Sequence, residues 1–444
     1  MIKKLLSKFE KSRGQNYENI PHLADYNLKN KTILLRTDYN VPIKQNKNRK
    51  QFTILDDFKI KISIPTIKYL LKQNCKIVII SHLKKPKSHD TSLSLKPIAK
   101  RLEKLLSLKK QKVIFLEDCI GKTIQEKIRS KKQKTIFLCE NIRFYKEEYE
   151  NDSAFAHSLA KIGDFYVNEA FSVSHRKHTS IAKLPAILPS AAGFHLEKES
   201  THILRAFKSK RPNIWLLGGA KLDKLDIVLA ALDHADIILI GGAICFSFLK
   251  AKGNNIGQSL VTSKSINDAR KILKHKNAKK IILPIDILVS KNIPEKNSND
   301  KTKVYCVPVT EIPNGTIGLD IAEKTTELFS FYLNQSKTVV INGPVGYVEN
   351  KSFQKGTKKL LELVANKSKN HQTFSIVGGA ETTQMVSKLK IQKKISHIST
   401  GGGALLTMLS KKKMPGLIAL CKKKKTKKKK KENKNQKKKK IRLY

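Results

Sequence analysis

The sequence lacks several patterns that would have restricted its function. Its longest nearly apolar stretch, 237–249, is interrupted by Gly241 and Gly242 and is too short to cross a bilayer, so no membrane span is predicted. The six cysteines form no Cys-x-x-Cys pair, which argues against a zinc site or a disulfide scaffold and favours a reducing, cytoplasmic environment. Residues 1–10 have no long apolar core or small-residue cleavage site, so no secretory signal is predicted, whereas a transit peptide stays open.

Catalytic motifs of several common kinds are also missing. No glycine-rich turn matches the Walker pattern or a strict dinucleotide-binding fingerprint. We find no Ser-His-Asp or Cys-His arrangement that would supply a general base. The sequence contains no internal repeat of short period.

Acidic residues are scarce: the chain has 36 Asp and Glu and 89 Lys and Arg, which gives a formal charge of +53. Residues 422–444 hold fourteen Lys, one Arg and one Glu, so this stretch carries +14 of that charge. Like charges repel, so we expect a disordered tail, which could bind nucleic acid non-specifically or an anionic membrane. The alternative, which we favour, is drift toward lysine, because lysine is abundant throughout and no aromatic residues alternate with the lysines of the tail.

The length of 444 residues is too great for one hydrophobic core, so two domains are expected. Apolar runs without alternation, typical of parallel strands covered on both faces, recur along the chain. In the first half they are 32–36, 76–80, 113–116, 135–138 and 165–167, separated by helical stretches such as 95–106 and 153–162. This alternation predicts an α/β protein of two lobes, each a parallel sheet flanked by helices, and residues 197–208 have the periodicity of a linker helix.

Five apolar runs in the second half end in a glycine turn and pass into a helix-like segment. They are 214–217, 237–240, 339–341, 374–377 and 395–400. Glycine lets a ligand approach the backbone, and a helix N-terminus offers unpaired N–H groups to anions. Gathered at the carboxyl edge of one sheet, such turns predict a phosphate-rich ligand such as a nucleotide. They also fit the ordinary connections of an α/β domain, so their spacing alone leaves both interpretations open.

The strand ends of the first half carry basic and polar residues in place of glycine. In chain order these are Arg36, Asp38 and Asn40, then His82 and Lys85, then Arg143, and finally His175, Arg176 and His178. Arginine is a better bidentate partner than lysine for phosphate and carboxylate, so arginines at strand ends of a lysine-rich chain predict an anion pocket. The competing interpretation is ordinary surface charge.

Ten stretches in order resemble phosphoglycerate kinase, from about Tyr26 to Leu420. They are RTDYNVP, SHLKKPK, ENIRFYKEEYEND, YVNEAFSVSHRKHTS, GGAKLDKLD, FLKAKGNNIGQSL, GLDIAEKTTELF, NGPVGYVE, GGAET and HISTGGGA. Each stretch alone is a weak signal, but their order over nearly the whole chain makes the resemblance specific.

The resemblance implies a glycolytic enzyme that transfers a phosphoryl group reversibly between 1,3-bisphosphoglycerate and ADP, giving 3-phosphoglycerate and ATP, with Mg²⁺. It implies a cytoplasmic monomer with two lobes joined by a linker helix and a hinge. We expect an N-terminal extension at 1–20, a 3-phosphoglycerate lobe at 21–196, a linker helix at 197–209, a nucleotide lobe at 210–400, a returning C-terminal helix at 401–421 and the tail at 422–444. The acceptor carboxylate is already ionised at neutral pH, so no general base is needed.

The family's functional positions can be carried over residue by residue. Substrate binding falls to Arg36, Asp38, Asn40, Lys59, His82, Lys85, Arg143 and Arg176. Nucleotide binding falls to Gly218, Lys221, Lys224, Gly242, Asn342, Pro344, Glu349, Gly378, Gly379, Glu381 and Thr382, with Glu349 placed for the ribose hydroxyls and Glu381 for the metal. Catalytic roles fall to Lys59, Lys221, Gly378 and Gly401.

Several of these positions depart from the family's usual residue. Lys59 stands where the family has a catalytic arginine, and it keeps the charge without the planar fork of a guanidinium. Glu381 replaces a metal-binding aspartate, Lys84-Lys85 replaces Gly-Arg, and Ile341 replaces a tryptophan. Together the substitutions predict reduced turnover. Two alternatives stay open, namely a kinase-like scaffold with weakened catalysis that binds nucleic acid and an inactive structural relic.

Overall fold

The computed structural model describes residues 17–45, 52–106, 112–208, 210–222, 225–295 and 303–421. The chain divides into two units: unit 1 runs to Thr201 and resumes at Lys413, and unit 2 is His202–Lys412. Residues 1–16 and 422–444, most of the expected extension and all of the expected tail, lie outside the described residues. The lobe boundaries expected at 196, 209 and 400 stay predictions.

Unit 1 is built on a parallel sheet of six strands in the order β5-β6-β4-β1-β7-β8. The strands are β1 (Thr32–Arg36), β4 (Lys76–Ile80), β5 (Val113–Leu116), β6 (Ile136–Cys139), β7 (Phe165–Asn168) and β8 (Ser190–Ala192). Its helices are α2 (Phe58–Lys61), α3 (Ile64–Lys72), α4 (Lys96–Leu106), α5 (Lys122–Arg129), α6 (Lys146–Glu150), α7 (Ser153–Ala160) and α8 (Leu184–Ile187). An antiparallel hairpin, β2 (Ile43–Gln45) and β3 (Phe52–Ile54), was not predicted.

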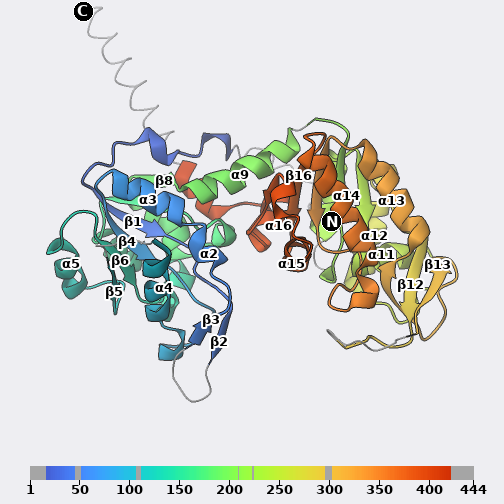
Figure 1. Ribbon diagram of the computed structural model, residues 1–444, viewed down its shortest axis with the longest axis horizontal. Coiled ribbons are helices and arrows are strands. Elements are labelled where there is room, and N and C mark those ends of the chain that lie inside the picture. The colour runs from blue at the N-terminus through green and yellow to red at the C-terminus, as the bar shows by residue number, and fades with distance from the viewer. Residues whose placement is uncertain are drawn as a thin grey trace, which may run out of the picture. The chain divides into compact units, whose positions relative to one another are not determined.

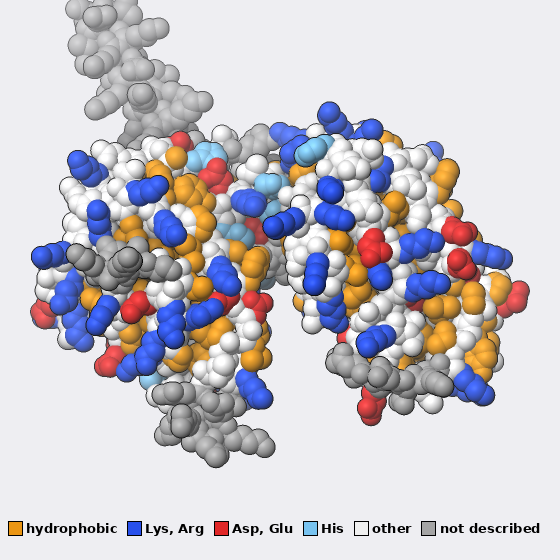
Figure 2. Space-filling view, in the orientation of Figure 1, with side chains coloured by type: hydrophobic (Ala, Val, Ile, Leu, Met, Phe, Trp, Pro, Cys, Tyr) orange, Lys and Arg blue, Asp and Glu red, His pale blue; other side chains and the backbone are white. Residues whose placement is uncertain are grey.

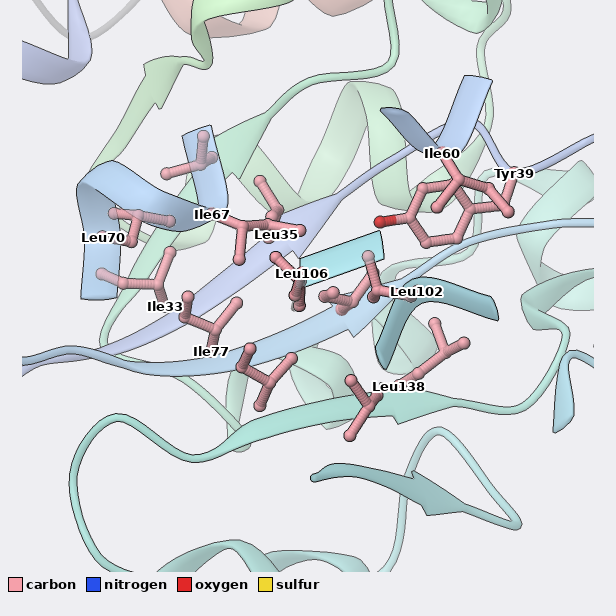
Figure 3. Close-up of a cluster of buried hydrophobic side chains, with 14 of the residues drawn as sticks. Ile33, Leu35, Tyr39, Ile60, Ile67, Leu70, Ile77, Leu102, Leu106 and Leu138 are labelled. Atoms are coloured by element: carbon pink, nitrogen blue, oxygen red, sulfur yellow. The ribbon is translucent and has the colours of Figure 1, made fainter. Parts of the chain in front are cut away.

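Both faces of this sheet are buried, as strands without alternation require. On one face, side chains of the central strands pack against helices α3 and α4 (Figure 3). Figure 3 labels Ile33 and Leu35 of β1, Ile77 of β4, Leu138 of β6, Ile67 and Leu70 of α3, and Leu102 and Leu106 of α4. The alternate residues Leu34 and Val78, which point to the opposite face, are also fully buried. Each such side chain stabilises the fold by about 1.5–3 kcal/mol.

Unit 2 contains a second parallel sheet, in the order β11-β10-β9-β15-β16-β17. Figure 1 labels its strand β16 and helices of the same unit. The strands are β9 (Asn213–Leu217), β10 (Ile237–Ile240), β11 (Ile281–Ile282), β15 (Thr338–Asn342), β16 (Phe374–Gly378) and β17 (His397–Ile398). The helices are α10 (Leu225–His234), α11 (Gly242–Ala251), α12 (Ser263–Leu273), α13 (Glu323–Gln335), α14 (Lys355–Lys369), α15 (Ala380–Lys388) and α16 (Gly403–Leu409). The five predicted strands therefore share one sheet, and the predicted fold of two parallel-sheet α/β lobes is confirmed.

Some elements differ from the expectation. The run expected at 395–400 contributes only the two-residue strand β17. A three-stranded antiparallel sheet of β12 (Asp286–Ser290), β13 (Tyr305–Pro308) and β14 (Ile317–Ile321) was not predicted, because its pairing joins residues distant in sequence. In the described part of the chain, no helix has the length and apolar character that a membrane span requires.

Helix α9 (Phe194–Phe207) begins three residues before the expected linker helix and contains the division between the units at Thr201. Its start is fixed by side chains remote in sequence. The N–H of Phe194 donates to the Thr66 hydroxyl at 3.1 Å, and the N–H of His195 donates to Glu169 at 3.1 Å. These bonds satisfy first-turn N–H groups that would otherwise lack partners, and local periodicity cannot reveal them.

Candidate functional site

The basic side chains of unit 1 are brought together by neighbouring strands. Arg36 ends β1, His82 follows β4, Arg143 follows β6, and Arg176 follows β7. Strands β6, β4, β1 and β7 are adjacent in the sheet and parallel, so these four residues leave it at the same carboxyl edge. Cationic side chains gathered at one edge would attract an anionic ligand. Elsewhere, Lys and Arg are spread over the visible face of each unit (Figure 2).

Arg36 is fully buried and contacts Ser180, Thr37 and His82. Its Nε donates to the Ser180 hydroxyl at 2.8 Å, and Nη1 donates to the Thr37 carbonyl and lies 3.2 Å from Nδ1 of His82. Since a guanidinium can only donate, Nδ1 of His82 accepts and the ring proton lies on Nε2. Burial lowers the pKa of His82 well below its usual value, so this imidazole is neutral at pH 7.

Asp38 joins His82 to Lys59. Its Oδ1 lies 3.6 Å from Nε2 of His82, and its Oδ2 accepts from Nζ of Lys59 at 2.7 Å and from the hydroxyl of Ser172. Burial would raise the pKa of Asp38, but the neighbouring His82, the Lys59 ammonium and the hydrogen bonds from Lys59 and Ser172 outweigh it and hold that pKa well below its ordinary value. The ammonium of Lys59 is therefore directed at a permanent carboxylate, and its side chain stays 29% exposed.

Arg143 and Arg176 retain unused donors. Arg143 is buried, donates to the Lys84 carbonyl and lies over the ring of Tyr149, with Cζ 5.7 Å from the centroid. Burial, and then the neighbouring Arg36 and Arg176 cations, lower the pKa of Arg143 to about 10, so it remains charged at pH 7. Among the described residues, Arg143 Nε and Arg176 Nε are buried and have no hydrogen-bond partner, whereas Arg36 Nη2, also without a hydrogen bond, lies 3.6 Å from the Glu148 carboxylate. Buried cationic donors without partners point to an anionic ligand.

The two other predicted residues of unit 1, Asn40 and Lys85, differ in their contacts. Asn40 is half-buried and accepts from the N–H of Lys84 at 2.8 Å, which ties the ends of β1 and β4 together. Lys85 is exposed, and within the described residues its side chain makes no hydrogen bond or ion pair. Lys85 is therefore not brought into the hydrogen-bonded cluster.

The glycine turns of unit 2 pack against one another. Gly218 N donates to the Asn342 carbonyl at 3.0 Å, and Gly219 N donates to the Pro344 carbonyl at 2.7 Å. A Cβ on Gly218 would lie 2.2 Å from the Pro344 oxygen, and Gly343, with φ of +89°, faces Gly218 equally closely. At Gly218 and Gly343 close contact between two loops therefore requires glycine, and this favours the ordinary connection over ligand approach, the two interpretations that the spacing left open.

Helix N-termini follow three of the five turns directly. Helix α11 begins at Gly242, α15 at Ala380 and α16 at Gly403. After β9 the next helix with described bounds begins at Leu225, and after β15 the next α-helix begins at Lys355, preceded by a short 3₁₀ turn at Lys351–Phe353. Each of the five turns is therefore followed by a helix, but after β9 and β15 a longer loop lies between the turn and the helix.

A pocket of about 250 Å³ opens beside these turns. Its lining includes Gly219, Gly242, Phe246, Pro344, Glu349 and Glu381. Apolar side chains suit a flat ring, and the carboxylates suit hydroxyl groups or a cation. Asp320 also lines the pocket, and its burial raises its pKa to about 8 against the opposing hydrogen bonds from the N–H groups of Gly356 and Ile321.

Two polar side chains near the pocket have unused atoms. Among the described residues, Asn342 Nδ2 and Thr382 Oγ1 are buried without a hydrogen-bond partner. A Cβ on Gly378 would lie 3.2 Å from that Asn342 nitrogen and 2.0 Å from Cδ2 of Leu405, so a larger residue would have to displace the Leu405 side chain. Gly379, with φ of +92°, is the residue before α15. Two unpaired side-chain groups beside a helix N-terminus suit a phosphate.

The remaining predicted residues of unit 2 are Lys221, Gly401 and Lys224. Lys221 is exposed and makes no hydrogen bond or ion pair with the described residues. Gly401 is buried and its N–H donates to the Ser399 hydroxyl at 3.1 Å. Lys224 lies outside the described residues, so its placement stays a prediction.

Sequence reasoning missed the polar residues that support the cationic cluster. Ser172 binds Asp38, Ser180 binds Arg36, and the fully buried Glu148 accepts two hydrogen bonds from Ser180. Glu148 lies in the run Lys-Glu-Glu-Tyr-Glu, whose composition is typical of an exposed helix. No local signal distinguishes it from its neighbour Glu147.

Comparison with known proteins identifies the family. The sequence model of the family described as phosphoglycerate kinase matches residues 23–412. This chain belongs to the phosphoglycerate kinase family. The phosphoglycerate kinase of Dictyoglomus turgidum is 40% identical over 407 residues, covering 91% of this chain and 98% of that protein. The enzyme of Aquifex aeolicus is 39% identical over 403 residues, covering 90% and 97%.

Solved structures of phosphoglycerate kinases have the same fold as this chain. Phosphoglycerate kinase from Coxiella burnetii superposes with a TM-score of 0.79 at 30% identity, covering 91% of this chain and 99% of that one. The enzyme from Pyrococcus horikoshii OT3 gives a TM-score of 0.75 at 32% identity, covering 90% and 98%. The predicted family and enzyme class are confirmed: the chain is a phosphoglycerate kinase, a glycolytic phosphotransferase with a carboxyl acceptor. No observation favours the nucleic-acid-binding alternative.

Proposed function

We propose that the arginine cluster of unit 1 binds the acid substrate and the pocket of unit 2 binds the nucleotide. The reaction is reversible phosphoryl transfer between 1,3-bisphosphoglycerate and ADP, giving 3-phosphoglycerate and ATP. The observation that carries the proposal is the pair of guanidinium nitrogens, Arg143 Nε and Arg176 Nε, that are buried without a hydrogen-bond partner among the described residues. A buried cation is costly unless it is paired, and a phosphorylated acid would complete these pairs.

On the acid side, Arg143 and Arg176 supply the donors for phosphate and carboxylate. Lys59 is aligned by Asp38, which is itself held by Ser172, so the ammonium is placed before substrate arrives. Lysine gives a single point charge where a guanidinium would give a fork, and this supports the expectation of reduced turnover.

On the nucleotide side, the apolar part of the pocket suits the base. Glu349 would accept the ribose hydroxyls, and Asn342 and Thr382 would bind phosphate oxygens through their unpaired atoms. The N-terminus of α15 adds backbone N–H groups that favour negative charge. Lys221, exposed beside this edge, is free to meet a phosphate.

The residues present fit Mg²⁺ carried by the nucleotide. Within the described residues, no group of three or more His, Cys, Asp and Glu could hold a metal. Mg²⁺ is commonly bound by one or two carboxylates together with substrate phosphates, and Glu381 lines the pocket in the first turn of α15. When bound, the cation would neutralise charge on the phosphate oxygens. Glu381 would hold it one methylene farther from the helix than an aspartate.

Catalysis would depend on positioning and on charge stabilisation. The attacking group in the ATP-consuming direction is a carboxylate, which needs no general base, and the neutral His82 is not required to take a proton. Arg143, Arg176 and Lys59 orient the acid, while Lys221 and helix N-termini stabilise charge on the transferred group.

A coupled assay tests the proposal. The purified chain, given 3-phosphoglycerate, ATP and Mg²⁺, should form ADP, and omission of the acid should abolish the signal. The Arg143→Lys variant should raise KM for the acid by about tenfold or more, because it loses the bidentate fork. Absence of acid-dependent turnover, or an unchanged KM in the variant, would contradict the assignment.

The monomeric state, the cytoplasmic location and the non-specific binding of nucleic acid by residues 422–444 belong to the same proposal. Light scattering during gel filtration would determine the mass in solution. Related proteins are named both cytosolic and chloroplastic, so their names do not decide the location of this one. Imaging of a tagged full-length chain would decide it.

A further inference from the structure

Glu148 is a fully buried carboxylate that the proposed mechanism does not use. It lies in α6, where its neighbour Glu147 is half-buried and has a side chain without hydrogen bonds or ion pairs to the described residues. Burying a carboxylate is costly unless it is paired and hydrogen-bonded. The contacts of Glu148 therefore indicate what offsets that cost.

Those contacts lead to Arg36 through one hydroxyl. Ser180 donates its backbone N–H to Oε2 of Glu148 at 2.8 Å and its hydroxyl to Oε1 at 2.6 Å. The same hydroxyl oxygen accepts from Nε of Arg36 at 2.8 Å, and Arg36 Nη2 lies 3.6 Å from Oε1. A hydroxyl has one proton, so donation to Glu148 turns its lone pair toward Arg36. Glu148 thus sets the direction of the bond that holds the guanidinium.

The other edge of Arg36 meets His82. Nη1 of Arg36 donates to Nδ1 of His82, which leaves the imidazole proton on Nε2, 3.6 Å from Oδ1 of Asp38. Asp38 in turn accepts from Lys59. The groups therefore form one polar chain in the order Glu148, Ser180, Arg36, His82, Asp38 and Lys59. Its first three members, Glu148, Ser180 and Arg36, are fully buried, and its last, Lys59, is partly exposed.

We propose that Glu148 is a positioning residue of the acid-substrate site: through Ser180 and Arg36 it fixes the orientation and tautomer of His82, and so the Asp38–Lys59 pair. The inference rests on the proposed function, since it takes this pair as part of that site. Simple electrostatics would give the opposite expectation, because removing a negative charge from a cationic cluster strengthens the attraction of an anion.

Two substitutions break the series of polar contacts from Glu148 to Lys59 at different residues. In Glu148→Gln an amide nitrogen replaces one carboxylate oxygen. This NH₂ group would face another donor, either the N–H of Ser180 or Arg36, so Glu148 no longer fixes the direction of the Ser180 hydroxyl bond. Ser180→Ala removes the hydroxyl but keeps the charge of Glu148 near Arg36, and this variant should fold even if the first does not. Glu147→Gln, which changes the same charge in the same helix, is the matched control.

The positioning role predicts a division between kcat and KM. Both variants should lower kcat by about tenfold or more, with KM for 3-phosphoglycerate unchanged or lower, while the control keeps wild-type values. The double variant should be no worse than either single one, because both act through Arg36. A kcat within about twofold of wild type in Ser180→Ala, or effects that multiply in the double variant, would overturn the inference.

A spectroscopic measurement separates this inference from the proposed function. In ¹⁵N-labelled protein, the ring nitrogens of His82, assigned with a His82→Gln variant, should show one neutral tautomer protonated at Nε2. Ser180→Ala should shift that pattern toward a tautomer mixture, and an unchanged pattern would refute the relay. If the wild-type chain transfers no phosphate, the proposed function fails, and these shifts still decide whether Glu148 orients His82.

Discussion

The wild-type protein should lose stability through Glu169 as the pH rises from 4.5 to about 8. A Glu169→Gln variant should not show this loss. Glu169 is buried beneath the start of α9, and burial raises its pKa from 4.5 to about 8 against opposing hydrogen bonds from Thr66 and the N–H groups of His195 and Leu196. Within this range the folded protein keeps a proton that the unfolded chain has released. The contribution of Glu169 to stability is therefore complete below pH 4.5 and is lost as the pH rises toward 8.

The magnitude follows from these two pKa values. One pH unit between them changes the free energy of unfolding by about 1.4 kcal/mol, so wild type should lose roughly 2 kcal/mol between pH 5.5 and 7.5 through this group. Glutamine copies the neutral acid, and its oxygen can still accept from Thr66 and His195. The variant should match wild type within about 1 kcal/mol at pH 5.5 and exceed it at pH 7.5.

Urea unfolding followed by far-UV circular dichroism at pH 5.5, 6.5 and 7.5 would measure the difference. Other groups titrate equally in both proteins, so the wild-type value minus the variant value isolates Glu169. The single tryptophan, Trp215, lies in unit 2, and its fluorescence gives an internal reference for that unit. Glu147→Gln should behave as wild type. Parallel pH profiles for wild type and Glu169→Gln would refute the reasoning.

Three further predictions concern single features of the molecule. Lys59→Arg should raise kcat by up to about tenfold, because the guanidinium restores a bidentate donor, and steady-state rates without a gain would remove Lys59 from the account of reduced turnover. Gly343→Ala should destabilise unit 2 by roughly 2–4 kcal/mol, because φ is +89° and the new Cβ would lie 2.2 Å from the Gly218 oxygen. An unchanged unfolding transition, followed by the fluorescence of Trp215, would contradict this. Deletion of residues 422–444 should leave kcat within about twofold while weakening salt-sensitive RNA retention, and lost activity would show that the tail matters for catalysis.

Much of the fold could be predicted because parallel strands buried on both faces appear as continuous apolar runs. Strands β1, β4, β5 and β10 have the predicted bounds, since in each case a turn or a polar residue ends the run. The hairpin of β2 and β3 and the antiparallel sheet around β12 were missed. These strands are only three to five residues long and depend on pairing with another segment, which periodicity within one segment does not report.

The sequence also predicted part of each candidate site. Arginines at strand ends of a lysine-rich chain gave the cationic cluster, and glycine turns gave the edge beside the unit 2 pocket. Glu148 and Ser180 could not be found, because their role comes from burial and from one shared hydroxyl. Nor could sequence show that Gly218 and Gly343 serve contact between loops, which requires their close approach in space.

Calorimetric titration of the full chain with 3-phosphoglycerate and with Mg-ADP, each alone, tests the central claim most directly. We expect wild type to bind both ligands. Arg143→Lys should weaken only 3-phosphoglycerate, by about tenfold or more, and Gly343→Ala should weaken only Mg-ADP. If Arg143→Lys leaves the affinity for 3-phosphoglycerate unchanged, or weakens Mg-ADP equally, the assignment of the acid to unit 1 and of the nucleotide to unit 2 is contradicted.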